Sequence, residues 1–249
     1  MEIQKISVCI LTKNSEKYLV SCLESLRDFS EIIILDNGSE DNTIAIAESF
    51  HNTKIIKHDF IGFGPLKNLA AEKAKNDWIL SIDSDEILSY DLLKSIKHLN
   101  ADERAVYSFP RENHYNGKLI KCCGWYPDLV LRLYNKKITE FNQNLVHESI
   151  ITKDLDVKRL KGSIAHYTFD SVEELVDKMQ RYSTLYAQDN KNKKSSSPWK
   201  AFSHASFAFI RNYFLKKGIF YGYEGFLISV CNSLGVFFKY IKLYEENKR

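Results

Sequence analysis

A short acidic motif, Asp83-Ser84-Asp85, holds the side chains of this sequence that are best suited to chemistry. Two carboxylates spaced two residues apart can bind a divalent cation with hard oxygen ligands, leaving positions for water and diphosphate oxygens. A cation bound there would neutralise the charge that develops on a departing nucleoside diphosphate. In an arbitrary loop the same motif is a solvated acidic turn, so its place in the fold decides its meaning.

A second polar cluster begins at Asp36, directly after the apolar run 31–35. Its structural interpretation is a turn that ends a strand, with Asp41 or Asn42 capping the next helix. Its functional interpretation is that Asp36 or Asn37 hydrogen-bonds a nucleobase or a ribose at the edge of a sheet. A buried polar group beside an apolar strand needs such a partner. The two interpretations are compatible.

Apolar runs and helical periodicities alternate through the first hundred residues. The runs typical of strands are 6–11, 31–35, 54–57 and 78–82. The helical patterns between them cover 18–26, 42–50 and 66–75. This alternation predicts βαβ units and a mostly parallel, doubly wound α/β sheet. Ligands of such sheets gather at the carboxyl ends of the strands, where both polar clusters lie.

The pattern changes after residue 100. Strands are expected at 105–109 and 118–122 around the hairpin signal Asn116-Gly117, and again at 129–134. A helix is expected near 171–190. From residue 198 onward, aromatic residues recur at helical spacing among Lys and Arg, which predicts a helical, aromatic and basic extension.

Composition and charge limit the class of protein. The chain of 249 residues is 44% hydrophobic and 13% aromatic, enough for one large α/β domain with an appendage. Residues 191–249 carry eleven Lys or Arg against three Glu, although the whole chain has a net charge of only +3. The five cysteines include no CxxC pair and no signal peptide is recognised, so a reduced, cytoplasmic protein is expected.

Several further segments complete a family resemblance. They are 7–14 (SVCILTKN), Lys67-Asn68, 77–86 (DWILSIDSDE), Trp125-Tyr126-Pro127-Asp128, Arg132-Leu133-Tyr134 and Val146-His147-Glu148. With the two polar clusters, they resemble the catalytic domain of glycosyltransferase family 2, which has the GT-A fold. Their order and spacing are similar to the subgroup that adds glucose to the heptose of the lipopolysaccharide inner core. The resemblance covers nearly the whole chain.

The resemblance implies a nucleotide-sugar site with bound Mg²⁺ or Mn²⁺. Asp83 and Asp85 would hold the cation. Many relatives have two acidic residues where this chain has Asp36-Asn37, so the second contact here would come from an amide. The residues implied to surround the nucleotide sugar are Thr12, Asn14, Asp36, Asn37, Lys67, Asn68, Asp83 and Ser84.

Inverting transfer needs a general base that takes the proton of the acceptor hydroxyl. Glu148 is the candidate, and Asp128 is the reserve because many relatives have an acidic pair where this chain has His147-Glu148. The structural alternative for that pair is a surface strand end with a salt bridge. His147 or His166 could instead complete the metal shell.

Three other residues are candidates for the acceptor or for a phosphate. Arg132 could bind a phosphate on the donor or on the acceptor, or could form an internal ion pair. Trp125 and Tyr126 could stack on a sugar face or simply pack. His147, already named as a possible metal ligand, is grouped with them as a possible acceptor contact.

The expected domains are a GT-A catalytic domain, 1–195, and an extension, 196–249. Within the first, 1–100 would bind the nucleotide sugar and 101–195 the acceptor. The extension has no clean apolar stretch of about 20 residues, the length that a transmembrane helix needs. It is therefore expected to lie on the cytoplasmic face of the inner membrane as an interfacial element. A helical cap over the catalytic domain and a dimer interface are the alternatives.

The expected function is transfer of a hexose, glucose from UDP-glucose, to a lipid-linked glycan such as the inner-core heptose of lipopolysaccharide or lipooligosaccharide. A nucleotidyltransferase is the first alternative, but 11–16 (LTKNSE) lacks the glycine-rich phosphate loop that such enzymes carry after their first strand. A non-enzymatic module that binds nucleic acid or membrane is the second. No recognised nucleic-acid-binding motif supports it, so nucleic acid is not an expected partner.

Overall fold

The computed structural model describes residues 2–144 and 148–249. The described chain divides into two compact units. The sheet unit comprises the chain up to Glu112 together with Asp128–His166, and the helical unit comprises Asn113–Pro127 and Tyr167–Arg249. This division differs from the boundary after residue 195 that the sequence suggests. The reason is that the helix at 172–190 packs against the last helix of the chain.

One mixed sheet runs through the structure in the order β3-β2-β1-β4-β8-β6-β10-β5. Strands β1 to β4 are parallel to one another, as the sequence predicts, and β8 pairs with β4 in the antiparallel direction. The strands are β1 (Ile6–Thr12), β2 (Ile32–Asp36), β3 (Thr53–Lys57), β4 (Trp78–Asp83), β5 (Glu86–Leu88), β6 (Ala105–Tyr115), β7 (Lys118–Leu119), β8 (Asp128–Asn135), β9 (Asp156–Arg159) and β10 (Ile164–Phe169).

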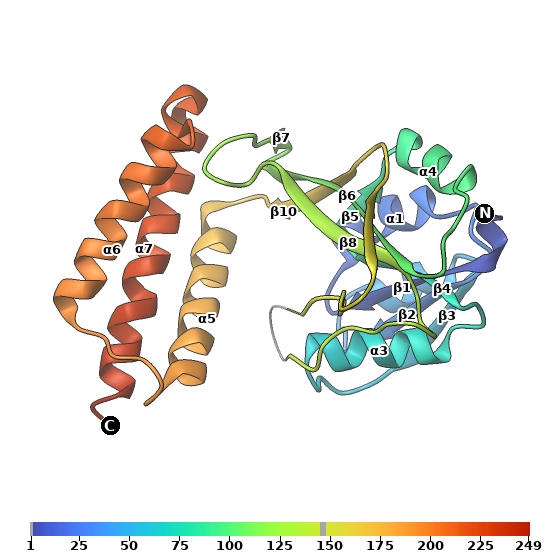
Figure 1. Cartoon of the computed structure of the whole chain (residues 1–249), viewed down its shortest axis with the longest axis horizontal. Helices are drawn as coiled ribbons and strands as arrows, with labels where there is room; N and C mark the ends of the chain where they lie inside the picture. The colour runs from blue at the N-terminus through green and yellow to red at the C-terminus, as the bar shows by residue number, and fades with distance from the viewer. Residues whose placement is uncertain (1, 145–147) are drawn as a thin grey trace. The chain divides into compact units, whose positions relative to one another are not determined.

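Helices cover both faces of the parallel strands (Figure 1). Helices α1 (Glu16–Ser25), α2 (Thr43–Glu48) and α4 (Tyr90–Lys97) contribute to one apolar cluster, and α3 (Phe63–Lys73) contributes to a second. Within β1, Val8 and Ile10 belong to the first cluster and Cys9 to the second. A strand that is buried on both faces reads as a continuous apolar run, which explains the sequence pattern.

Helix α3 begins at Phe63, three residues before the predicted start, and includes Gly64 and Pro65 in its first turn. Proline is tolerated there because the first N–H groups of a helix have no partner within the helix. A Cβ at Gly64 would lie 1.9 Å from the carbonyl oxygen of Asn142, so only glycine fits. The Gly64 N–H donates to the carbonyl of Asn144 at 3.2 Å. The start of α3 is thus bound to the segment that precedes Glu148.

The helical unit contains three long helices, α5 (Val172–Asn190), α6 (Pro198–Ile210) and α7 (Gly222–Glu246). A π turn, η2 (Arg211–Leu215), and a short 3-10 turn, η3 (Gly218–Tyr221), connect α6 to α7, and another 3-10 turn, η1 (Ile3–Lys5), precedes β1 in the sheet unit. The side chains of Ser171 and Ser197 cap the first turns of α5 and α6. Helix α7 packs against both α5 and α6 (Figure 1).

The predicted hairpin is confirmed, but its second strand is short. Asn116 and Gly117 have φ angles of 47° and 73°, as a tight primed turn requires. The strand expected at 118–122 ends at Leu119. Cys123 and Gly124 adopt left-handed conformations, with φ angles of 54° and 84°, so the segment turns away from extended structure.

Helix α7 corrects one expectation about the tail. Within 218–246 an 18-residue window has a mean hydropathy of 1.4, so by length and composition this segment is apolar enough to cross a membrane. Gly222 is the first residue of α7 and Gly225 lies in its first turn, so neither glycine interrupts the helix. Core helices of soluble proteins can have the same composition but are mostly buried, whereas 22% of that window is buried here.

Candidate active site

The polar side chains predicted at the strand ends lie together at one edge of the sheet. Strand β1 is flanked by β2 and β4, with Thr12 opposite Asp36 and Leu11 opposite Asp83. The Thr12 hydroxyl donates to the Asp36 carboxylate at 3.0 Å. Parallel neighbours end on the same side of the sheet, so the two polar clusters form a single site.

Hydrogen bonds join the loops that follow these strands. The backbone N–H of Asn14 donates to Ser39 Oγ at 2.9 Å, and the Asn14 side chain accepts from the backbone N–H of Glu40 at 2.9 Å. Asn14 has a φ of 51°, a left-handed conformation that asparagine tolerates. Ser84 Oγ donates to Ser15 Oγ at 2.9 Å. The predicted nucleotide-side residues Asn14 and Ser84 therefore belong to one connected set of loops.

Asp36 is buried and its carboxylate is saturated. It accepts from the Ser39 hydroxyl at 2.5 Å and from the backbone N–H groups of Gly38 and Ser39 at 3.0 and 2.9 Å, besides Thr12. Burial opposes ionisation, but these hydrogen bonds outweigh it and lower the pKa of Asp36. Asn37 Nδ2 donates to the carbonyl of His58 at 2.9 Å. Both side chains thus hold the shape of the loop.

Asp83 lies between two cations that come from different elements. Arg132 Nη2, on β8, is 2.5 Å from Asp83 Oδ2, and Lys67 Nζ, on α3, is 3.1 Å from Asp83 Oδ1. Burial opposes ionisation, but Arg132 and then Lys67 outweigh it and hold the pKa of Asp83 well below its usual range. Asp83 is therefore ionised at neutral pH.

The ion pairs extend in both directions from Asp83. Lys67 Nζ also lies 2.9 Å from Glu148 Oε1. Arg132 also contacts Glu86 at 2.6 Å, Glu86 contacts Arg111 at 3.4 Å, and Arg111 Nε lies 2.8 Å from Asp128 Oδ2. The two candidate bases, Glu148 and Asp128, thus stand at opposite ends of one chain of ion pairs with Asp83 inside it. This ion-pair network consists of Asp83, Glu86, Asp128, Glu148, Lys67, Arg111 and Arg132.

Glu86 and Arg111 are site residues that the sequence reasoning missed. Glu86 is fully buried, and its Oε2 accepts from the backbone N–H of Asp83 at 3.0 Å. A buried carboxylate must be paired, which explains why two arginines contact it. The available signal was an acidic residue that follows Asp85 and precedes the apolar pair Ile87-Leu88.

Asp85 has a different environment from Asp83. Its side chain is 36% exposed, and its Oδ2 lies 3.3 Å from His166 Nε2. Among the described residues, the ion-pair network together with Asp85 contains five carboxylates against the three cations Lys67, Arg111 and Arg132. An excess of two negative charges remains when His166 is neutral.

Asn68 has a positioning role in the structure. Its Nδ2 donates to the carbonyl of Phe141 at 2.8 Å, and its Oδ1 accepts from the N–H of Phe141 at 2.8 Å. Both ends of the amide therefore bind the backbone of the segment that leads to Glu148. That Asn68 also contacts the nucleotide sugar stays a prediction.

The remaining predicted residues do not lie in the sheet unit or are not described. Trp125 and Tyr126 belong to the helical unit. There the Trp125 ring packs 5.7 Å from that of Phe169, and the Lys121 ammonium lies 5.2 Å from the centre of the Tyr126 ring. His147, predicted as an acceptor or metal contact, lies outside the described residues.

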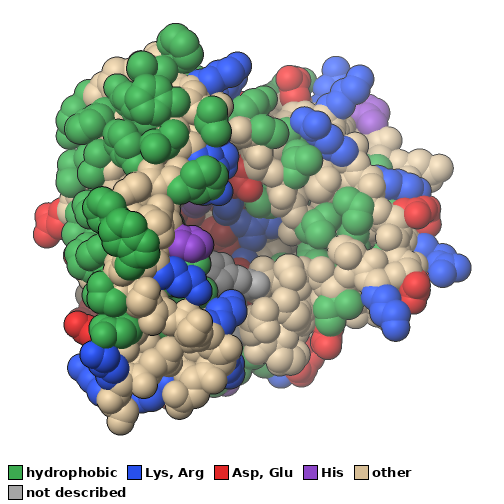
Figure 2. All heavy atoms as spheres, turned by 60° about the vertical axis from the view of Figure 1, so that its left-hand side comes forward, with side chains coloured by type: hydrophobic (Ala, Val, Ile, Leu, Met, Phe, Trp, Pro, Cys, Tyr) green, Lys and Arg blue, Asp and Glu red, His purple; other side chains and the backbone are tan. Residues whose placement is uncertain are grey.

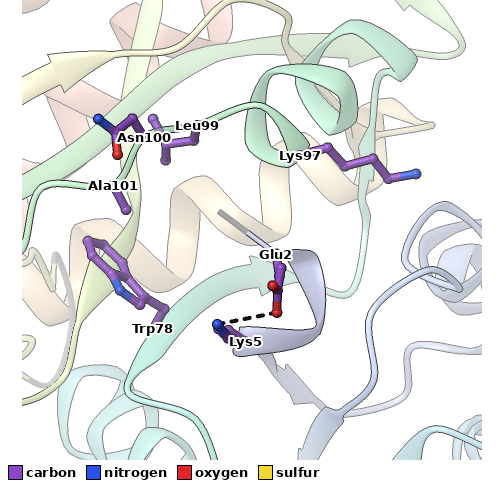
Figure 3. Close-up of a pocket in the computed structure, with 7 residues that line it drawn as sticks. All are labelled: Glu2, Lys5, Trp78, Lys97, Leu99, Asn100 and Ala101. Carbon is purple, nitrogen blue, oxygen red and sulfur yellow. Dashed lines mark ion pairs between the residues drawn. The ribbon is translucent and has the colours of Figure 1, made fainter.

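A pocket of about 570 Å³ lies at the opposite end of the parallel strands and does not belong to this site. Trp78, which lines it, is the first residue of β4, whereas Asp83 is the last. Its charged residues include Glu2 and Lys5, an exposed pair at 3.3 Å (Figure 3). Exposed pairs of this kind contribute little to binding or stability.

The buried part of the network allows a prediction about stability. Arg132→Met leaves the buried Glu86 without its shortest ion pair, and breaking a buried pair costs about 3 to 5 kcal/mol. We expect urea denaturation to show a fall of that size in the free energy of unfolding. Lys137→Met breaks the exposed pair with Asp77 at 2.7 Å and is the control, with an expected loss below about 1 kcal/mol. Equal losses in the two variants would contradict the structural importance of Arg132.

Comparisons with known proteins agree with this architecture. The profile of Glycosyl transferase family 2 matches residues 7–144. An uncharacterized glycosyltransferase of Rickettsia typhi is 31% identical over 97% of this chain and 87% of its own length. The lipopolysaccharide core biosynthesis glycosyltransferase LpsC of Rhizobium meliloti is 28% identical over 97% of this chain and 93% of its own length.

The fold has a counterpart among solved structures. A mannosyltransferase of Pyrobaculum calidifontis, solved with GDP-mannose and Mn²⁺, superposes with a TM-score of 0.57, at 12% identity, over 96% of this chain and 86% of its own. The architecture is that of the GT-A fold, with a helical C-terminal extension. The profile match covers more than half of the chain and the Rickettsia relative nearly all of it. The chain therefore belongs to glycosyltransferase family 2.

Proposed function

We propose that this enzyme transfers a hexose, with glucose from UDP-glucose as the first candidate, to a lipid-linked glycan with inversion at the anomeric carbon. The acceptor proposed is the heptose of a lipopolysaccharide or lipooligosaccharide inner core. The observation that carries the proposal is the ion-pair network, which connects a strand-end aspartate to two possible bases within one site. Similarity to LpsC, a lipopolysaccharide core enzyme by name, supports the choice of acceptor.

The carboxylates at the strand end suit a hard divalent cation. Asp83 and Asp85 are each about one-third exposed at their side chains, and the ion-pair network with Asp85 has an excess of two negative charges. Among the described residues, no group of three or more His, Cys, Asp or Glu side chains is arranged to hold a metal. We therefore propose that Asp83 and Asp85 hold Mg²⁺ or Mn²⁺ together with diphosphate oxygens, so that metal and donor bind jointly. The bound cation would neutralise charge on the leaving diphosphate.

Glu148 is the proposed general base. In the reaction the acceptor hydroxyl oxygen bonds to the anomeric carbon, and the bond from that carbon to the diphosphate breaks with its electron pair. The hydroxyl proton passes to the Glu148 carboxylate. Lys67 contacts both Glu148 and Asp83, so it would hold the base at a fixed place relative to the metal-binding edge. Asp128 is the second candidate.

The remaining nucleotide-side residues have different proposed roles. Asn14 and Ser84 would contact the nucleotide sugar directly, and the buried Thr12 would hold the Asp36 carboxylate in place. Asp36, Asn37 and Asn68 would act by positioning, because their side chains bind neighbouring backbone and hydroxyl groups. Arg132 would keep its contact with the buried Glu86, share Asp83 with the cation, and add positive charge near the diphosphate.

We also propose that the enzyme works in the cytoplasm, at the inner face of the inner membrane. A lipid-linked acceptor would be presented there, and the helical unit carries the basic and aromatic residues suited to that surface. Trp125 and Tyr126 are proposed acceptor contacts.

Calorimetric titration of the purified protein tests the class of donor. We expect UDP-glucose with Mn²⁺ to bind, and expect binding to weaken at least about tenfold when a chelator removes the metal. Mn²⁺ alone is expected to bind weakly because the protein supplies too few ligands. UDP-galactose and UDP-N-acetylglucosamine complete the panel, and preference for either would correct the sugar. Absence of binding by every nucleotide sugar would contradict the proposed reaction.

A further inference from the structure

The helical unit has an unusual concentration of exposed apolar side chains. Figure 2 shows hydrophobic side chains over much of the surface of the helical unit, where most of the large exposed apolar residues fall within 199–234. Single exposed apolar residues are normal, but a continuous field of this extent indicates a contact surface. The large exposed side chains in this range are Trp199, Phe202, Phe207, Ile210, Phe214, Leu215, Ile219, Phe220, Tyr223, Phe226 and Leu234.

Helix α6 has four of its five large apolar residues on the outside, and only Phe209 packs inward against other rings. Its buried residues are the alanines 201, 205 and 208, which share one face and have small side chains. Trp199, Phe202, Phe207 and Ile210 follow the opposite pattern and are half exposed or more. A helix that covers a protein core in water normally buries its large apolar residues. The pattern of α6 is the reverse and requires an apolar environment outside the protein.

The charges around α6 are all positive. Residues 191–223 contain no Asp or Glu and seven Lys or Arg. Three of these, Arg211, Lys216 and Lys217, are exposed and lie beside Phe214 and Leu215. An aromatic surface with a basic border complements the headgroup region of an anionic bilayer.

Helix α7 packs against neighbouring helices over part of its surface, and 22% of its most apolar window is buried. It contacts α5 and α6. Near its end the Lys242 ammonium donates to the Gln180 carbonyl at 3.0 Å and to Ser183 Oγ at 2.8 Å. Near its start Glu224 pairs with Lys118 at 2.9 Å. These contacts tie both ends of α7 to other elements of the helical unit.

We infer that α6 and η2, with η3, form an in-plane membrane-binding face for an anionic lipid bilayer, while α7 remains inside the helical unit. The aromatic side chains of α6 enter the boundary between headgroups and acyl chains. Arg211, Lys216 and Lys217 contact lipid phosphates. The inference specifies the proposed membrane location and rests on that part of the proposed function, but it is independent of the proposed reaction.

Pairing of two copies through the same face is disfavoured by charge. Each copy would bring Arg211, Lys216 and Lys217, and no carboxylate from 198–221, into a shared interface. Like charges in an interface weaken association. An anionic bilayer has no such penalty.

Flotation with vesicles of phosphatidylcholine and phosphatidylglycerol tests the face in the full-length protein. Wild type is expected to float with the vesicles, and Phe207→Ser with Phe214→Ser to reduce the bound fraction at least about tenfold. The matched control is Tyr90→Ser with Val157→Ser, which removes two exposed apolar side chains from the sheet unit and should float like wild type. Lys216→Glu with Lys217→Glu should also reduce binding at least about tenfold at low salt.

Further measurements distinguish in-plane binding from a transmembrane span and from dimerisation. Bromolipid should quench the fluorescence of wild type, and Trp199→Phe should lose most of that quenching, because Trp199 is 76% exposed. Alkaline carbonate should release the protein from membranes, whereas retention would show that α7 spans the bilayer and overturn the inference.

Flotation that is unchanged in Phe207→Ser with Phe214→Ser, or a dimer that this variant dissociates, would also overturn it. UDP-sugar binding should be equal in all variants, so loss of lipid binding is distinguishable from failure of the proposed reaction.

Discussion

Asp85→Ala is expected to lower metal-dependent sugar transfer by roughly a thousandfold. Asp85 lies in the turn two residues after the end of β4, is 36% exposed at its side chain, and has His166 as its ion-pair partner among the described residues. Its carboxylate is therefore available as a metal ligand. Loss of one hard ligand removes several kcal/mol of stabilisation from the charge on the leaving diphosphate, and each 1.4 kcal/mol is a factor of ten in rate. The assay is transfer from UDP-glucose with Mn²⁺ and with chelator.

The stability of Asp85→Ala separates this role from a structural one. Because Asp85 is partly exposed, we expect the urea midpoint to stay close to that of wild type. Asp154→Asn is the control, since Asp154 has a φ of 61° that asparagine also adopts readily. That variant should keep both stability and rate. An unchanged rate in Asp85→Ala would remove the metal assignment, and an unfolded protein would assign Asp85 a structural role.

Much of the sheet could be predicted because its strands are buried on both faces. Continuous apolar runs such as that of β2, followed by a polar turn at Asp36, give both the element and its end. The hairpin at Asn116-Gly117 was recognisable because few residues adopt the required φ angles. The early end of β7 was not predictable. The chain turns at Cys123, which has a left-handed backbone, and the residue types around a pair of cysteines do not indicate such a conformation.

The candidate site could likewise be predicted only in part. Polar residues after apolar strands must converge in a parallel sheet, so Thr12, Asp36 and Asp83 could be grouped from the sequence. Which side chains face a ligand and which hold the loops depends on contacts between distant segments. Asn68 binds the backbone of Phe141, and Arg111 meets Glu86, at separations that no periodicity encodes.

The network also has a consequence for how the donor binds. Asp83 already has Arg132 and Lys67 as partners, so a cation that binds Asp83 must compete with them or share the carboxylate. The diphosphate carries negative charge and offers those same cations new partners. Metal and nucleotide sugar should therefore assist each other's binding, and the calorimetric affinity for each should increase in the presence of the other.

Glu148→Gln is expected to lower turnover by about a thousandfold while UDP-glucose affinity stays within about threefold of wild type. Glutamine preserves the size of the side chain, and its oxygen can still accept from Lys67, which lies 2.9 Å from Glu148 Oε1. It cannot take a proton from the acceptor. The measurement is kcat from initial rates together with donor affinity by calorimetry. A variant that retains turnover would exclude Glu148 as the base.

Asp128→Asn is the matched comparison, because Asp128 stands at the other end of the same network. Its partner Arg111 keeps a second carboxylate, Glu86, at 3.4 Å, so the variant should fold and bind the donor. If Glu148 is the base, Asp128→Asn should reduce turnover by less than about tenfold. The reverse ranking would move the base to Asp128. Equal large losses would mean that the two carboxylates act as one coupled unit, and the double variant would then be no slower than either single one.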